Sequence, residues 1–174
     1  MLEPTQHWEA LRDGFRWDIP DRLNMAAQVC DDWAEADPER VAIIDDQAGA
    51  ITYGRLREMA DGLARELVAE GVVRGDRVGV LRTQSPWTAA AHIAIWKLGA
   101  ISIPLFKLFK RDALATRLAD AGASVVVTDE GGVALLDGLG VEALVPETMG
   151  ALDAAPFPAA ETGPEDPAVL IYTS

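Results

Sequence analysis

The spacing of apolar residues changes along the chain and separates one predicted helix from three predicted strands. Between residues 53 and 70 the large apolar side chains recur every three or four positions, as expected for one face of a helix. They are Leu56, Met59, Leu63 and Leu67. Three later runs are apolar at nearly every position: RVGVL (77–81), AISIP (100–104) and SVVVTD (124–129). Such unbroken runs predict strands that are buried on both faces of a sheet.

Two further helices are expected between these strands. Ser85 followed by Pro86 is typical of a helix start, and the apolar segment that follows ends at Gly99. A second helix is expected over residues 112–121. The alternation predicts an α/β fold, a mostly parallel sheet with helices on both faces. Ligands of such sheets bind beyond the carboxyl ends of the strands.

The remaining elements are expected to be shorter. Asn24 can cap a helix that ends near Pro38, and residues 41–45 and 51–53 predict a small hairpin. After residue 129 the sequence predicts four segments in order. They are a short helix (VALLDGL), a short strand (VEALV), an irregular connection (146–166) and a last strand (AVLIYTS).

Charge narrows the possible partners. The 174 residues carry 28 acidic and 15 basic side chains, a formal net charge of -13. An acidic surface repels phosphate backbones, so nucleic acid is not an expected partner. The longest apolar stretch, residues 88–105, is interrupted by His92, Lys97 and Pro104, so no membrane span is expected. The N-terminus lacks the apolar core of a signal peptide, and a cytoplasmic location is the default expectation.

Cysteine and histidine are too scarce for several kinds of site. The single cysteine, Cys30, has Ala26, Val29 and Trp33 as helical neighbours, which indicates a core thiol. Only two histidines are present, so neither a cysteine–histidine nucleophile nor a zinc site is expected. Trp33 and Trp96 are expected in the core.

Three segments at strand ends are candidates for binding an anion. Thr173 and Ser174 follow the last strand, where hydroxyl and N–H groups can hold phosphate. Lys107, Lys110 and Arg111 form the densest basic cluster. The third candidate precedes a helix N-terminus and consists of Arg82, Thr83, Gln84 and Ser85. Each segment also has a plain structural alternative on these patterns alone. In the same order, these are an ordinary strand end, a solvated loop and a capped connection between a strand and a helix.

Five segments in order resemble the N-terminal part of an adenylate-forming (AMP-binding) enzyme of the acyl-CoA synthetase branch. They are ITYGRL (51–56), GDRVGVL (75–81), SPWTAAAHIAIWKLGAISIPL (85–105), LADAGASVVVTD (118–129) and LIYTS (170–174). The resemblance implies an N-terminal extension at 1–23 and the front of an AMP-binding domain at 24–174. It also implies ATP, Mg2+ and coenzyme A as cofactors, and a small carboxylic acid as substrate.

The resemblance gives the end of the chain a role. In this family the strand runs into a phosphate-holding loop of the pattern YTSGTTGxPKG, and Tyr172, Thr173 and Ser174 match its first positions. Thr173 and Ser174 are therefore expected to line the ATP phosphates, and no catalytic residue can be placed. The family's later glycines, lysine and acidic magnesium ligand would lie beyond Ser174. We therefore expect the 174 residues alone to be inactive, with an apolar face open to self-association.

One position departs from the family pattern, and two other functions stay open. Arg55 stands where the early motif usually has the glutamate of a capping box, which puts local stability in question. The first alternative is a non-catalytic, stand-alone α/β binding domain. The second is an adenylation domain that loads the thiol of a carrier protein.

Overall fold

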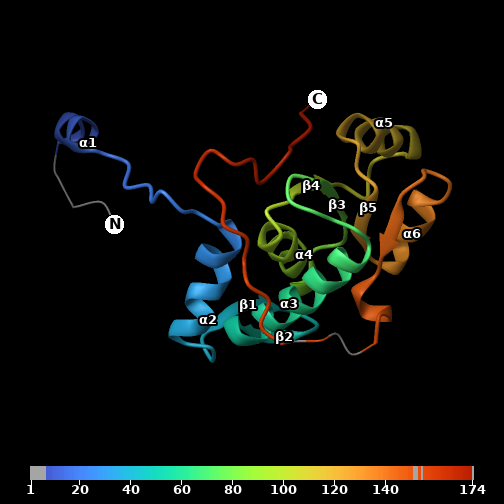
Figure 1. Cartoon of the computed structure of the whole chain (residues 1–174), viewed down its shortest axis with the longest axis horizontal. Helices are drawn as coiled ribbons and strands as arrows, with labels where there is room; N and C mark the ends of the chain where they lie inside the picture. Colours follow the sequence, from blue (N-terminus) through green and yellow to red (C-terminus); the bar gives the residue numbers. More distant parts are fainter. Residues whose placement is uncertain (1–6, 151–152, 154, 174) are drawn as a thin grey trace.

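The computed structural model describes residues 7–150, 153 and 155–173, and it confirms the α/β prediction. Figure 1 shows a central sheet with helices packed on both sides. All four strands run parallel in the order β4-β3-β5-β6. Their bounds are β3 Arg77–Leu81, β4 Ile101–Leu105, β5 Val125–Thr128 and β6 Glu142–Leu144.

Six α-helices and two short helical turns are found in the described part of the chain. The α-helices are α1 Trp8–Gly14, α2 Asp32–Ala36, α3 Tyr53–Ala69, α4 Pro86–Lys97, α5 Arg111–Ala121 and α6 Glu130–Leu136. The turns are the π-helix η1 Ala27–Asp31 and the 3-10 helix η2 Pro146–Thr148. The hairpin strands are β1 Val41–Asp45 and β2 Gly49–Thr52.

Alternate side chains of the strands point into two separate cores. Val78 and Val80 of β3 pack with α3 and α4, whereas Leu81 packs with Leu114 and Leu118 of α5. Between Val78 and Val80, position 79 is a glycine. A Cβ there would come within 3.0 Å of a Val126 methyl, so the packing leaves no room for a side chain. The two cores explain why these strands are apolar at every position.

The helix starts follow the sequence prediction in most places. The Asn24 side chain accepts the N–H of Ala26 at 2.9 Å, as expected for its cap. The Thr52 hydroxyl accepts the N–H of Arg55 at 3.2 Å, so α3 keeps half of a capping box. Arg55 instead pairs with Glu58 at 3.0 Å. Helix α3 therefore keeps its Thr52 cap although Arg55 stands in place of the family's glutamate.

The core prediction is right for Cys30 and wrong for Trp33, which is exposed. Cys30 is buried, and this burial, with the nearby Asp31 carboxylate, raises the pKa of its thiol to about 12. Val29 and Trp33 are 43% and 40% exposed. Trp33 instead stacks on Tyr53 with the ring centroids 5.8 Å apart.

The predicted last strand is only partly formed. Within the described residues, its one pairing to the sheet is a parallel bridge between Ser102 and Val169, beside β4. Ile171 is 67% exposed, so the run is not buried on both faces as its sequence predicts. Its side chains alternate instead, with Leu170 and Tyr172 packed on the core and Val169 and Ile171 exposed.

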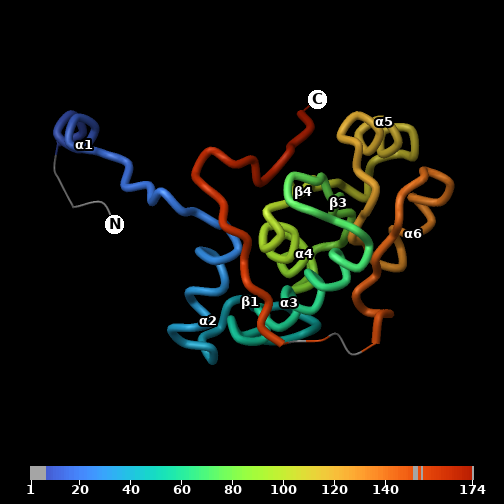
Figure 2. Tube along the Cα trace, in the orientation of Figure 1, coloured from blue at the N-terminus to red at the C-terminus, as the bar shows by residue number. Residues whose placement is uncertain are grey.

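The connection before this strand is irregular, as predicted, but it follows a fixed path. We call residues 155–168 the strap. Figure 2 shows the strap in red, running past α4 toward the end of the chain. The Ala160 N–H donates to the Lys97 carbonyl at 2.7 Å, which joins the strap to the end of α4.

Candidate functional site at the carboxyl edge of the sheet

The carboxyl ends of the parallel strands bring several polar side chains to one edge. Leu81 at the end of β3 lies opposite Leu105 of β4 and Thr128 of β5. The residues that follow these ends include Arg82, Thr83, Lys107 and Asp129. Two of the three predicted anion-binding segments therefore meet at this edge, through Thr83 and Lys107.

Asp129 joins these two segments. Its carboxylate accepts the Lys107 ammonium at 2.8 Å and the Thr83 N–H at 2.9 Å. It also accepts the Gly132 N–H at 2.9 Å and so caps α6. Desolvation opposes the charge of Asp129, but the bonds from Lys107 and Thr83 outweigh it and lower its pKa to about 2. Asp129 therefore neutralises the one lysine that reaches this edge.

Arg82 is held in the same way by protein groups. Its side chain is only 2% exposed, and its guanidinium donates to the Thr128 carbonyl and to the Glu147 carboxylate. The predicted anion site around Arg82 and Ser85 is therefore not free to bind an anion through this charge. The Ser85 hydroxyl makes no capping bond, contrary to its predicted role, and the Thr88 N–H bonds instead to the Ser85 carbonyl at 2.9 Å.

An open cavity of about 440 Å³ adjoins this edge, between the β1–β2 turn and the start of α4. Its charged lining residues are Asp45, Asp46, Asp129, Glu147, Arg55 and Arg82. Four carboxylates face two guanidinium groups, so the lining is acidic. Such a lining does not suit a phosphate group.

The basic cluster predicted at residues 107–111 is divided by the fold. Lys107 turns to Asp129 at the start of α6, whereas the Arg111 guanidinium reaches Gly138 beyond its end, 3.0 Å from the position of a Cβ there. Lys110 precedes α5 and is exposed. The three cations do not form one site.

The last described residues approach the same edge from beside β4. Tyr172 fixes them to α5, because its hydroxyl donates to the Asp120 carboxylate at 2.7 Å. That bond, with burial, raises the pKa of Tyr172. Thr173 is exposed beyond this anchor, and Ser174 lies outside the described residues. Thr173 is thus in a position where its hydroxyl is open to a ligand.

Sequence reasoning did not identify Asp129, Glu147 or the strap as parts of this region. Asp129 had a readable signal, because it directly follows a strand and aspartate is a preferred residue at the start of a helix. Glu147 had none, since its pairing with Arg82 spans 65 positions of the chain.

A model of the AMP-binding enzyme family matches residues 30–174. The chain belongs to this family. An acetyl-coenzyme A synthetase of Streptomyces coelicolor is 38% identical over 136 residues, which are 75% of this chain and 21% of that enzyme. The chain thus spans about a fifth of the length of this relative.

Solved structures of the family have the same fold. VinN in complex with 3-methylaspartate superposes with a TM-score of 0.79 at 28% identity, over 90% of this chain and 45% of VinN. The nonribosomal peptide synthetase FmoA3 gives a TM-score of 0.80 at 28% identity, over 92% of this chain and 17% of that protein. The match to a part of these longer proteins agrees with the resemblance of the five ordered segments.

The exposed Thr173 hydroxyl suits a phosphate oxygen, whereas the acidic cavity beside Arg82 does not. Within the described residues, no group of three or more His, Cys, Asp or Glu side chains is placed to hold a metal ion. None of the described helices is long and apolar enough to cross a membrane.

Proposed function

We propose that this chain is the N-terminal portion of an ATP-dependent acid–thiol ligase. Such an enzyme joins a carboxylate to the α-phosphate of Mg-ATP with release of pyrophosphate, and then passes the acyl group from the adenylate to a thiol with release of AMP. The observation that carries the proposal is the path of the chain through Tyr172 and Thr173. It runs beside β4 toward the carboxyl edge of a parallel sheet, in a chain that belongs to the AMP-binding family.

Thr173 and Ser174 are proposed to line the ATP phosphates. The anchor of Tyr172 on Asp120 supports this role, because it fixes the chain immediately before Thr173. We assign no catalytic residue to these 174 residues. The rest of the phosphate site would come from later residues, so the chain alone is proposed to be inactive.

The domain limits are proposed as an extension at 1–23 and the front of the AMP-binding domain at 24–174. Helix α1 has no buried residue, and Figure 1 shows it away from the sheet. The chain joins the body at Asn24, whose side chain donates to the Trp96 carbonyl at 2.9 Å. Asn24 thus ties the start of this segment to α4.

Coenzyme A is the proposed acyl acceptor and a small carboxylic acid the proposed substrate, with the cytoplasm as the proposed location. The acetyl-coenzyme A synthetase relative supports this choice. The likeness to FmoA3 supports a second candidate, an adenylation domain that loads a carrier-protein thiol. A panel of acids assayed with coenzyme A or with a carrier protein distinguishes the two.

The test is carboxylate-dependent exchange of labelled pyrophosphate into ATP. We expect exchange from the protein that continues past Ser174, with acetate or another small acid, and none from the 174 residues alone. Absence of exchange from the longer protein with every acid would leave the non-catalytic binding domain as the better reading. Exchange by the 174 residues would contradict the proposed inactivity. Light scattering over a range of concentrations tests self-association of the short chain.

A further inference from the structure

The strap is held to the body at three successive places before the last segment begins. The first is at Asn24, whose amide donates to the Ala160 carbonyl at 3.0 Å as well as to Trp96. Beside it, Leu23 and Thr162 exchange two bonds. The Leu23 N–H donates to the Thr162 carbonyl at 2.8 Å, and the Thr162 hydroxyl donates to the Leu23 carbonyl at 2.7 Å.

The second place is Asp166. Its carboxylate accepts the Gly163 N–H at 2.8 Å, which closes a turn within the strap. It also accepts the Arg74 guanidinium at 2.8 Å, and Arg74 donates to the Glu161 carbonyl at 2.8 Å. The turn is therefore tied to the loop that precedes β3.

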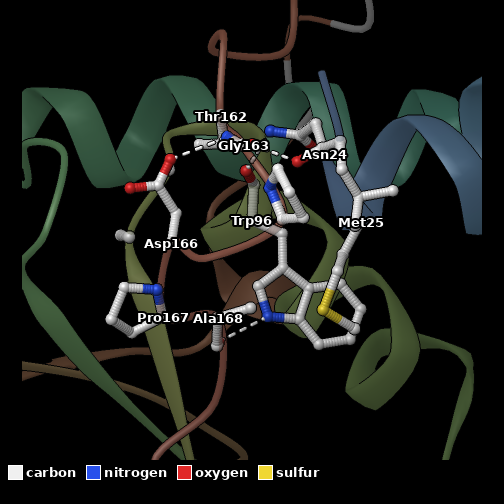
Figure 3. Close-up of a pocket in the computed structure, with 12 residues that line it drawn as sticks. Asn24, Met25, Trp96, Thr162, Gly163, Asp166, Pro167 and Ala168 are labelled. Atoms are coloured by element: carbon white, nitrogen blue, oxygen red, sulfur yellow. Dashed lines mark hydrogen bonds between the residues drawn. The ribbon is translucent and has the colours of Figure 1, made fainter. Parts of the chain in front are cut away.

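The third place is the Ala168 carbonyl, where the strap meets the last segment. Figure 3 shows the Trp96 indole directed at this carbonyl, to which its N–H donates at 2.8 Å. The Ser102 N–H of β4 donates to the same oxygen at 2.9 Å. One residue on, Val169 makes the bridge to Ser102, and the Leu170 N–H returns a bond to the Ser102 carbonyl at 2.9 Å.

This bridge decides which side chains of the last segment face the core. Leu170 and Tyr172 pack on the core under α5, whereas Val169, Ile171 and Thr173 are exposed. A slip of one residue would exchange these two sets, because side chains alternate along an extended chain. With Val169 opposite Ser102, Thr173 comes just past the end of β4 at Leu105.

The space beside the indole is not a ligand site of its own. A cavity of about 90 Å³ lies between Trp96, Asn24, Met25 and the strap. Pockets for small molecules usually measure roughly 300 Å³ or more. The contacts around Trp96 therefore hold the chain in place, and they leave no room for a nucleotide or an acyl group.

We propose that Trp96 is a positioning residue for the phosphate-binding segment. By its bond to the Ala168 carbonyl it sets the register of residues 168–173 against β4, and so it places Thr173 at the carboxyl edge. The inference rests on the proposed function, because it assumes that Thr173 contacts the ATP phosphates. In this proposal Trp96 acts through the Ala168 carbonyl and not through a contact with substrate.

Amide hydrogen exchange of the 174-residue chain tests the effect of the bond from the Trp96 indole to the Ala168 carbonyl. In the wild type, the Ser102 and Leu170 amides should be protected. In Trp96→Phe they should exchange about fivefold to tenfold faster, the effect of losing one hydrogen bond, while the Val126 and Val127 amides of the sheet stay protected. The matched control is Trp33→Phe, since Trp33 stacks on Tyr53 of α3.

Unprotected Leu170 in the wild type, or unchanged exchange in a folded Trp96→Phe variant, would overturn the inference. The protection of the Ser102 and Leu170 amides in the wild type can be measured even if the variant does not fold.

Steady-state kinetics of the protein that continues past Ser174 test whether Trp96 affects the binding of Mg-ATP. Trp96→Phe should raise KM for Mg-ATP about fivefold to tenfold and leave KM for the acid unchanged, whereas Trp33→Phe should change neither. Faster Leu170 exchange with an unchanged KM for Mg-ATP would overturn the positioning role. A wild-type protein without ATP–pyrophosphate exchange would instead refute the proposed function. The hydrogen-exchange result would then still decide whether Trp96 holds the segment.

Discussion

The two ends of α4 each bury a cation, but the cations have different partners. Lys97, the last residue of the helix, is 1% exposed and lies 2.7 Å from both Asp31 and Asp61. Arg82, just before the helix, is 2% exposed and pairs with Glu147, which is 43% exposed. At the Lys97 end the anions are also largely withdrawn from water, since the Asp61 side chain is 2% exposed. Thus Lys97 neutralises one carboxylate that water hardly reaches, Asp61, and a second, Asp31, that is only 22% exposed. Glu147, in contrast, can be hydrated without Arg82.

The Lys97 end also joins more of the chain. Asp31 comes from the π-helical turn η1 and Asp61 from α3, and the Lys97 ammonium donates to the Phe157 carbonyl at 3.2 Å. One side chain therefore ties two helices and the start of the strap to α4. Two carboxylates face one ammonium, so the cluster keeps an excess negative charge, and burial raises the pKa of Asp61.

Replacement of Lys97 should have the largest effect on stability. Lys97→Met leaves Asp31 and Asp61 facing each other without a cation, and breaking a buried ion pair costs about 3–5 kcal/mol. Urea unfolding measures this loss. Adding Asp61→Asn to Lys97→Met should recover part of it, because one stranded charge is removed. Lys110→Met, at an exposed lysine, is the control and should change stability by less than about 0.5 kcal/mol. If Lys97→Met loses no more stability than the Lys110→Met control, then water reaches the cluster of Lys97, Asp31 and Asp61.

Replacement of Arg82 should cost less. Arg82→Met removes the donor to the Thr128 carbonyl and the partner of Glu147, but the exposed Glu147 carboxylate can turn to water. We expect a loss of about 1–3 kcal/mol, the usual cost of leaving one buried acceptor without a donor. The same urea titration measures it, with the exposed Arg111→Met as control. If Arg82→Met costs as much as Lys97→Met, exposure of the partner carboxylate does not explain the difference between the two ends.

The aspartates beside the two ends of α4 should give opposite dependences on pH. The pKa of Asp129 falls from 3.8 to about 2, so its contribution to stability is present above pH 3.8 and is lost as the pH falls toward 2. The pKa of Asp61 is raised above 3.8, so its contribution is full below pH 3.8 and is lost as the pH rises through the raised pKa. The cost of Asp129→Asn should therefore shrink on acidification, while that of Asp61→Asn should shrink as the pH rises.

Urea unfolding of both variants and the wild type, in steps from about pH 2 to pH 7, checks this pair. Asparagine still serves as a helix cap at position 129, so Asp129→Asn tests the charge and not the cap of α6. The expected cost at neutral pH is about 1 kcal/mol, that of weakening one charge-assisted bond. Parallel pH profiles for the two variants would contradict the prediction.

These contacts show which parts of the fold a sequence alone predicts. The stripe of Leu56, Met59, Leu63 and Leu67 and the unbroken apolar strands are local patterns, and they predict α3 and the sheet correctly. The pairs of Lys97 with Asp31 and Asp61 depend on the fold that those patterns produce, since 66 positions separate Lys97 from Asp31. Nothing in the spacing of these residues indicates that they meet.

The strap and the candidate site show the same limit. Residues 146–166 are irregular by composition, and the sequence does not indicate that Arg74, Trp96 and Asn24 bond to the strap. Lys107 and Thr83 were identified as candidates because each follows a strand, but Asp129 pairs with both and neutralises Lys107. The role of Thr173 and Ser174 rests on their match to a family motif and stays a prediction.

The smallest expected effect lies at the N-terminal end of α4 and concerns Ser85. The sequence predicts that its hydroxyl caps the helix, and such caps are worth about 1 kcal/mol. In the structure this hydroxyl is buried without a hydrogen-bond partner among the described residues, and the Thr88 hydroxyl instead donates to the Thr83 carbonyl at 2.8 Å. Ser85→Ala should therefore change the free energy of unfolding by less than about 0.5 kcal/mol, whereas Thr88→Val, which keeps the shape, should cost about 1 kcal/mol. Thermal unfolding of the two variants measures both. If Ser85→Ala is the more harmful of the two, Ser85 caps the helix in solution, and this end of α4 is held locally rather than through the loop before it.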